Sequence, residues 1–167
     1  MQKIAVIQGA PGPLVQGLFQ TLAERWQPGT RVAGVIAEGH GLGERACSAG
    51  YLKSLLDGKR YPIFQDLGPG SETCHLTGDG AVGAAVAVAA DIARGCDLVI
   101  LSKFGRLEAN GGGLRDAFTA AMEAGVPVLT SVSGPHARLW ETFATPLFTL
   151  VPPDANAIEA WWRAVHH

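Results

Sequence analysis

The segment Asp97-Leu-Val-Ile-Leu-Ser-Lys-Phe-Gly-Arg-Leu-Glu-Ala-Asn-Gly-Gly-Gly113 leads from a short apolar run directly into a loop of charged residues and glycines. The run from Leu98 to Leu101 is too short for a helix by itself, and it is typical of a strand covered on both faces. Chemistry in open α/β sheets occurs where strands end. We therefore expect Lys103 to lie at the edge of a sheet.

Apolar runs alternate with helical patterns on both sides of this stretch, as a parallel sheet requires. The predicted strands cover residues 3–8, 31–37, 97–102, 126–132 and 147–151, and the predicted helices cover residues 14–26, 80–94, 114–124, 135–143 and a terminal segment after Asp154. Gly95 and Gly125 are suited to end helices, and Asp154 is suited to begin one. This order predicts one three-layer α/β domain over residues 1–167, with a mostly parallel sheet and right-handed crossovers.

Two extended runs, 51–56 and 60–65, flank Asp57-Gly58 and predict a β-hairpin added to the sheet. Residues 66–79 read as an irregular loop, and long loops in compact domains are usually functional or disordered. Helix 80–94 is rich in alanine and valine, so we expect it to be largely buried.

Helical spacing also predicts which side chains face the core. In the first helix we expect this face to carry Leu14, Gly17, Leu18, Leu22 and Trp26. Trp140, Trp161 and Trp162 have apolar neighbours at helical spacing, which indicates packing in the core or at an interface.

The composition excludes several classes of protein. With 47% apolar residues and a formal net charge of −2, the chain has no basic stripe for nucleic acid. Neither a signal-peptide pattern nor an apolar run of membrane-spanning length is present, so we expect a cytoplasmic protein that does not insert into membranes. The three cysteines, Cys47, Cys74 and Cys96, lack metal-type spacing and fit reduced thiols.

The first loop, Gln8 to Gly17, lies where a phosphate-binding loop would lie. A Walker A motif needs a lysine for the phosphates and a serine or threonine for magnesium. Counted from Gly9, the Gly-Lys-Ser positions hold Leu14, Val15 and Gln16, and counting from Gly12 gives no better match. The loop is either a tight turn or a weak anion-binding site made by backbone amides at a helix N-terminus.

A similar substitution occurs after the strand at 97–102. P-loop enzymes place an aspartate there to hold magnesium, often with a glutamate beside it, whereas this chain has Ser102 and Lys103. A cation in place of carboxylates favours an anion over a metal. Lys103, Arg106 and the amides of the helix after Gly111-Gly-Gly113 could converge on one oxyanion. Alternatively, Lys103 and Arg106 pair with Glu108 or Asp116 in a solvated structural cluster.

No other pattern predicts catalysis. Cys74-His75 alone does not supply the ligands of a tetrahedral metal site, and Ser133-Gly134 lacks the flanking glycines of a nucleophile elbow. We therefore assign no catalytic and no metal-binding residue.

Three runs together resemble a known family: Gln65-Asp-Leu-Gly-Pro-Gly-Ser71 with Cys74, the stretch 97–113, and Gly125-Val-Pro-Val-Leu-Thr130. The family is an uncharacterised bacterial one, distantly similar to the THEP-type nucleoside triphosphatases and often encoded near molybdate transport genes. The resemblance implies a P-loop NTPase-like fold and a role in molybdenum or tungsten metabolism. The resemblance does not identify the bound cofactor, and the two candidates are ATP with magnesium, or molybdate.

The residues and the resemblance together leave three hypotheses. The first is a protein that binds a small anion such as nucleotide, phosphate, molybdate or tungstate. The second is a nucleoside triphosphatase in which Lys103 replaces the Walker A lysine, and the third is a non-catalytic module that binds itself or a molybdenum-pathway protein. The residues predicted to bind the anion are Gly9, Ala10, Gly12, Gln65, Ser71, Cys74, Ser102, Lys103, Arg106 and Gly112.

Overall fold

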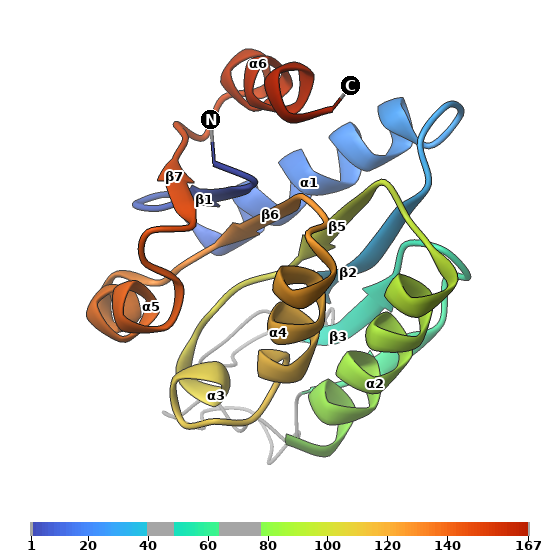
Figure 1. Ribbon diagram of the computed structural model, residues 1–167. Coiled ribbons are helices and arrows are strands. Elements are labelled where there is room, and N and C mark those ends of the chain that lie inside the picture. Colours follow the sequence, from blue (N-terminus) through green and yellow to red (C-terminus); the bar gives the residue numbers. More distant parts are fainter. Residues whose placement is uncertain (1, 40–48, 64–77, 167) are drawn as a thin grey trace.

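Short apolar runs form one seven-stranded sheet in the computed structural model, which describes residues 2–39, 49–63 and 78–166 (Figure 1). The strands are β1 (Ile4–Ile7), β2 (Val32–Gly39), β3 (Ala49–Ser54), β4 (Arg60–Pro62), β5 (Leu98–Leu101), β6 (Val128–Ser131) and β7 (Phe148–Leu150). Their spatial order is β4-β3-β2-β5-β6-β1-β7. Each neighbouring pair from β2 to β7 is parallel, which confirms the predicted mostly parallel sheet.

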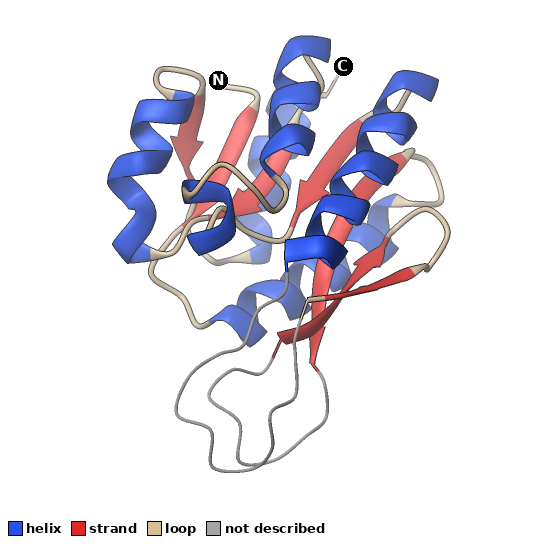
Figure 2. Cartoon of the chain, turned by 90° about the horizontal axis from the view of Figure 1, so that it is seen from below, coloured by secondary structure: helices blue, strands red, loops and turns tan. Residues whose placement is uncertain are grey.

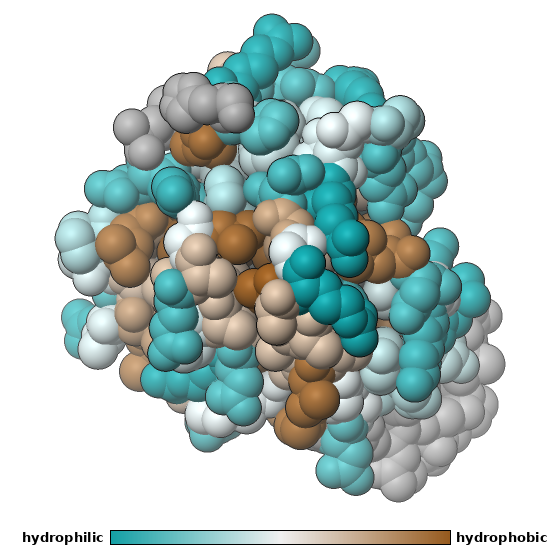
Figure 3. Space-filling view, turned by 45° about the vertical axis from the view of Figure 1, so that its right-hand side comes forward, coloured by the Kyte–Doolittle hydropathy of each residue, from teal (hydrophilic) through white to brown (hydrophobic). Residues whose placement is uncertain are grey.

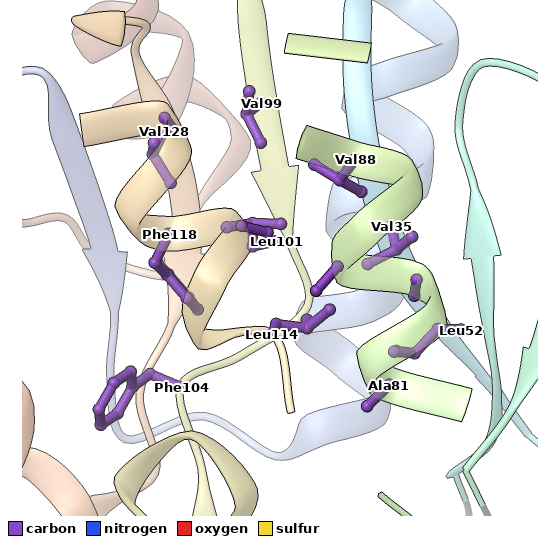
Figure 4. Close-up of a cluster of buried hydrophobic side chains, with 14 of the residues drawn as sticks. Val35, Leu52, Ala81, Val88, Val99, Leu101, Phe104, Leu114, Phe118 and Val128 are labelled. Atoms are coloured by element: carbon purple, nitrogen blue, oxygen red, sulfur yellow. The ribbon is translucent and has the colours of Figure 1, made fainter. Parts of the chain in front are cut away.

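The central strands are buried on both faces. All four residues of β5 are buried, and successive side chains point to opposite faces of the sheet. Val99 and Leu101 therefore pack into one hydrophobic cluster, whereas Leu98 and Ile100 pack into the other. Figure 4 shows Val99 and Leu101 facing side chains of the two nearest helices.

Two layers of helices cover the sheet (Figures 1 and 2). One layer contains α1 (Gly12–Trp26) and α6 (Ala155–Val165), and the other contains α2 (Gly78–Arg94), α4 (Arg115–Ala124) and α5 (Ala137–Ala144). The chain crosses from β1 to β2 in one direction and returns through β5 and β6 to β7 in the other. Right-handed crossovers that run in opposite directions place their helices on opposite faces, which accounts for the two layers.

The hairpin predicted on either side of Asp57-Gly58 is present as β3 and β4 at one edge of the sheet. β3 pairs with β2 in antiparallel fashion. The carboxylate of Glu38 accepts a hydrogen bond from Arg60 Nε at 2.7 Å and lies 3.6 Å from Lys53 Nζ. The hydrogen bond from Arg60 is the main reason that the pKa of Glu38 lies below its usual value.

Four aromatic side chains from α4, α5 and the loop after β5 pack together in one layer. The rings of Phe104, Phe118, Trp140 and Phe143 lie within 6.4 Å of one another, centroid to centroid. Trp161 and Trp162 are buried in the opposite layer. The tryptophans therefore belong to the core, as their spacing predicts.

The burial predicted for two helices needs correction. In α1 the core face begins at Val15, not at Leu14, which is 57% exposed; the buried residues of this helix are Val15, Phe19, Leu22, Ala23 and Trp26. Leu14 lies in the first turn of the helix, and the cluster that packs on the sheet begins with Val15. In α2 only the inner face is buried, and the outer face remains apolar and exposed.

Two smaller elements were not predicted or were predicted only in part. The four-residue helix α3 (Arg106–Ala109) lies inside the loop expected between β5 and α4. The helix predicted at 135–143 begins as a short 3-10 turn, η1 (Gly134–His136), and continues as α5. Asp154 does begin α6, where its carboxylate accepts hydrogen bonds from the amides of Asn156 and Ala157.

Candidate functional site

The carboxyl ends of β5, β6 and β1 lie side by side at one edge of the sheet. The crossover from β1 leads toward β2, whereas the crossover from β6 leads the opposite way to β7. In open α/β sheets, ligands bind outside the carboxyl ends of the strands where such a reversal occurs. Three loops follow these strand ends: residues 8–11 after β1, residues 102–105 after β5, and residues 132–133 after β6.

Gln16 in α1 connects this helix to β2 and to the residue that follows β5. Its side-chain Nε2 donates to the Ser102 carbonyl at 2.9 Å, and its Oε1 accepts from the Ala37 amide at 2.8 Å. Counted from Gly9, Gln16 occupies the position where a Walker A motif carries the magnesium-binding hydroxyl. Here both ends of the amide are used within the protein, so this side chain fixes the positions of the strand ends.

The loop after β1 retains few of the amides that a phosphate loop uses. Pro11 and Pro13 have no N–H, and the amide of Val15 donates to the Pro11 carbonyl at 3.2 Å. Gly12 and Leu14 supply the other amides of this first turn, and no side chain caps the helix. Gly9, Gly12 and the half-buried Ala10 are accessible to a ligand, but the donor set is smaller than that of a Walker A loop.

Lys103 lies at this edge, as the sequence predicts. Ser102 is buried, and the next side chain, Lys103, is exposed. A Cβ built on Gly105 would lie 3.0 Å from Lys103 Cε, so the glycine leaves room for the lysine stem. Within the described ranges, Lys103 makes no hydrogen bond or ion pair. Its charge is therefore available to a ligand.

Glu108 organises the loop that follows Lys103. The Glu108 side chain is buried, its Oε1 accepts from the Gly105 amide at 2.9 Å, and its Oε2 accepts from the Leu114 amide at 2.8 Å. Gly113 has a φ of 57°, and a Cβ at this position would collide with the Glu108 carboxylate. This residue is thus bonded to backbone amides and does not belong to a solvated ion-pair cluster with Lys103.

The backbone amides after Gly111-Gly-Gly113, which were expected to bind an oxyanion, are bonded within the protein. The Gly112 amide donates to the Leu107 carbonyl at 2.9 Å, and the Leu114 amide at the start of α4 is bonded to Glu108. These donors therefore have partners inside the protein. Arg106 is exposed in the first turn of α3, on the same loop as Lys103.

Two residues after β6 were missed by sequence reasoning. Ser133 Oγ and His136 Nδ1 lie 2.6 Å apart, across the 3-10 turn η1. Ser131 Oγ donates to the Ser102 carbonyl at 2.8 Å and so ties β6 to β5. The sequence signal for this pair is a Ser-x-x-His spacing directly after a predicted strand. A nucleophile elbow differs from it, because that motif requires flanking glycines.

Several predictions lie outside the described ranges. Gln65, Ser71 and Cys74 fall within residues 64–77, so the structure does not locate them. Among the residues that it does describe, no group of three or more His, Cys, Asp or Glu side chains could hold a metal ion. In the same part of the chain, none of the helices has the length and apolarity needed to cross a bilayer.

A shallow hollow of about 520 Å³ lies elsewhere, beside the amino-terminal end of β2. It is lined by the connection between α1 and β2 and by Leu55 and Leu56 after β3. Because it is at the opposite end of β2 from the carboxyl edge, it does not form part of the candidate site.

Cys96 lies in the Gly95–Asp97 turn before β5, and partial burial raises the pKa of its thiol.

Comparisons with known proteins agree with this architecture. A family model described as a protein of unknown function (DUF2478) matches residues 4–161. The crystal structure of THEP1 from the hyperthermophile Aquifex aeolicus superposes with a TM-score of 0.68 over 97% of this chain and 96% of that one, at 16% identity. This likeness confirms the predicted P-loop NTPase-like fold.

A curated relative adds a second kind of information. The chain is 38% identical over 136 residues to a protein of Bradyrhizobium diazoefficiens described as molybdenum import ATP-binding protein ModC 2. The match covers 81% of this chain and 15% of the length of that relative. The shared segment is therefore a small part of a longer protein in that organism.

Proposed function

We propose that this chain, which belongs to the DUF2478 family of proteins of unknown function, binds a small anion at the carboxyl edge of its sheet without efficient hydrolysis of nucleoside triphosphates. The ligand class is an oxyanion: nucleotide, phosphate, molybdate or tungstate. The residues proposed to contact it on the described loops are Gly9, Ala10, Gly12, Ser102, Lys103 and Arg106, together with Ser133 and His136.

The observation that carries the proposal is the exposed and unneutralised ammonium of Lys103. It follows β5, where magnesium-binding enzymes of this fold place a carboxylate. The nearest acidic side chain on its own loop, Glu108, accepts hydrogen bonds from two backbone amides. An ammonium at the mouth of a sheet, beside a helix N-terminus, attracts an anion and repels a metal ion.

The bonding of Gln16 argues against metal-dependent hydrolysis. An enzyme of this fold needs a hydroxyl at this position and a carboxylate after β5 to hold magnesium. Here Gln16 is hydrogen-bonded to Ser102 and Ala37, and the position after β5 carries Ser102 and Lys103. Anion binding is therefore expected to be independent of magnesium.

A role in molybdenum or tungsten metabolism is supported by the Bradyrhizobium relative, whose printed description concerns molybdenum import. The relative is also described as ATP-binding, and this favours a nucleotide as the second ligand to test. Its matched segment is 15% of its length, so the ATP-binding function need not reside in that segment.

Thermal unfolding with molybdate, tungstate, phosphate, sulfate and ATP, each with magnesium or with EDTA, tests the proposal. A ligand at a hundredfold excess over its Kd stabilises the folded state by about 3 kcal/mol. For a chain of this size that corresponds to a rise in Tm of roughly 6–12 °C. We expect the same rise with magnesium and with EDTA.

Lys103→Ala locates the site, and Lys59→Ala is the matched control, because Lys59 lies in the hairpin turn after β3. Loss of a charge-assisted hydrogen bond weakens binding by about tenfold to a hundredfold, whereas the control should bind as the wild type does. If no oxyanion or nucleotide raises Tm, the anion-binding function is wrong. Magnesium-dependent phosphate release that disappears in Lys103→Ala would favour the triphosphatase in its place.

A further inference from the structure

The outer face of α2 is apolar although it faces solvent. The inner face packs on the sheet through Ala81, Ala84, Ala85, Val88 and Ile92. On the outer face Val82 is 48% exposed and Val86 is 66% exposed, and Ala90 and Ala93 are exposed as well. The spacing of residues 82, 86 and 90 aligns these side chains along the helix. A helix that is apolar on all sides is normally buried on all sides.

Apolar residues also gather across the middle of this side of the molecule, with hydrophilic residues around them (Figure 3). The exposed side chains of α2 are small, and Gly83 and Ala87 lie beside the stripe formed by Val82, Val86 and Ala90. Small side chains allow two helices to approach at the short end of the usual 8–10 Å range. The surface is therefore shaped to receive another helix.

The charges on α2 lie at its two ends. Asp79 is in the first turn, and Arg94 is in the last turn, where it forms a 2.9 Å ion pair with Asp91 while its side chain stays 67% exposed. Asp79 is exposed and makes no hydrogen bond or ion pair with the other described residues. Asp79 and Arg94 stand at nearly equal distances along the helix from Val86.

We propose that a second copy of this chain packs its own α2 antiparallel across this stripe, which makes α2 the core of a two-fold symmetric dimer. In that arrangement Val86 meets Val86 of the second copy, and Val82 meets the second copy's Ala90. Asp79 of each copy then approaches Arg94 of the other. The opposite charges at the two ends make the surface complementary to itself, which is the requirement for an isologous interface.

The small size of the α2 surface favours a weak dimer. The helix from Asp79 to Arg94 spans about 22 Å at 1.5 Å per residue, and stable interfaces bury on the order of 1,200 Å² or more in total. One helix pair of this length, with valine and alanine side chains, makes a small interface on that scale. We therefore expect a Kd on the order of 10 µM.

Sedimentation velocity over roughly 1 to 200 µM protein tests the proposal. The wild type should shift from monomer to dimer across this range. Val86→Glu should remain monomeric, because it places a carboxylate at the centre of the interface. Leu139→Glu is the matched control, since Leu139 is a 49% exposed leucine on α5, and it should dimerise as the wild type does. Circular dichroism and Tm establish that each variant is folded.

A charge exchange tests the antiparallel arrangement. Asp79→Arg alone should weaken the dimer at least tenfold, because it faces the second copy's Arg94. The double variant Asp79→Arg with Arg94→Asp should recover most of that loss. A wild type that stays monomeric at the highest concentration overturns the proposal, as does a Val86→Glu variant that still dimerises. Failure of the double variant to recover affinity excludes antiparallel packing.

Discussion

Glu108 shows how one buried carboxylate can organise a functional loop. It occupies the third helical position of α3, from which a glutamate side chain reaches back to the amide that precedes the helix. Its other oxygen accepts from the amide at the start of α4. By joining the two ends of the loop, Glu108 fixes the backbone at Gly105 beside the Lys103 stem.

We expect Glu108→Gln to lower the free energy of unfolding by about 2 kcal/mol, because one carboxylate oxygen becomes an NH₂ group that faces an amide N–H. Glu108→Ala should cost about 3 kcal/mol, since both buried amides lose their acceptor. Urea denaturation measures both values. Glu123→Gln on the exposed face of α4 is the control and should change stability by less than about 0.5 kcal/mol. Equal effects at the two positions would contradict the role of Glu108.

Lys103 and Gln16 differ in how far the sequence reveals them. The position of Lys103 at the sheet edge follows from the apolar run before it, because strand ends are visible in the pattern. The contacts of Gln16 do not follow, since its two partners, Ala37 and Ser102, are distant in the chain. The sequence predicts that Gln16 cannot replace a Walker hydroxyl, but not that it bridges two strands.

The pairing of the elements β2 and β5 depends on the glycine at position 34. This glycine has a φ of 113°, and a Cβ built on it would collide with the backbone of Ile100. The pairing of β2 with β5 therefore requires a residue without a side chain. Gly17 in α1 is different, because nothing lies within 4 Å of a Cβ at that position.

Substitution of these two glycines by alanine should have effects of opposite sign. Gly34→Ala should destabilise the protein by at least about 3 kcal/mol, or prevent folding, because both backbone strain and a steric clash oppose it. Gly17→Ala should raise stability by about 0.5–1 kcal/mol, since alanine favours a helix more than glycine does and its methyl group collides with no other atom. Thermal and urea unfolding measure the difference. A destabilised Gly17→Ala would contradict the open surroundings of this position.

At the scale of the whole molecule, the terminal helix closes the fold over its first strand. Trp161 on α6 is buried, and its Nε1 donates to the Gln2 carbonyl at 2.9 Å. Trp162 packs against Trp26 of α1, with ring centroids 5.6 Å apart. The two ends of the described chain are thus held together in the layer on one face of the sheet (Figure 1).

We expect Trp161→Ala to lower the free energy of unfolding by about 3–5 kcal/mol, the usual cost of removing a large buried aromatic side chain. Trp161→Phe should cost about 1–2 kcal/mol, because it keeps most of the packing and loses the hydrogen bond to Gln2. Unfolding in urea followed by far-UV circular dichroism gives both values. Similar losses for the two variants would mean that the hydrogen bond, not the packing, holds α6 in place.

Local sequence patterns predict most of the strands and helices and the mostly parallel sheet. Short runs such as Leu98 to Leu101 predict buried parallel strands, and Asp57-Gly58 predicts the hairpin, because these signals depend on periodicity and turn chemistry within a few residues. The sequence also indicates that Lys103 replaces a carboxylate. Local patterns do not reveal the strand order, the bridge made by Gln16, the burial of Glu108 or the exposed apolar face of α2. Each of these depends on segments that are far apart in the chain and meet only when the sheet has formed.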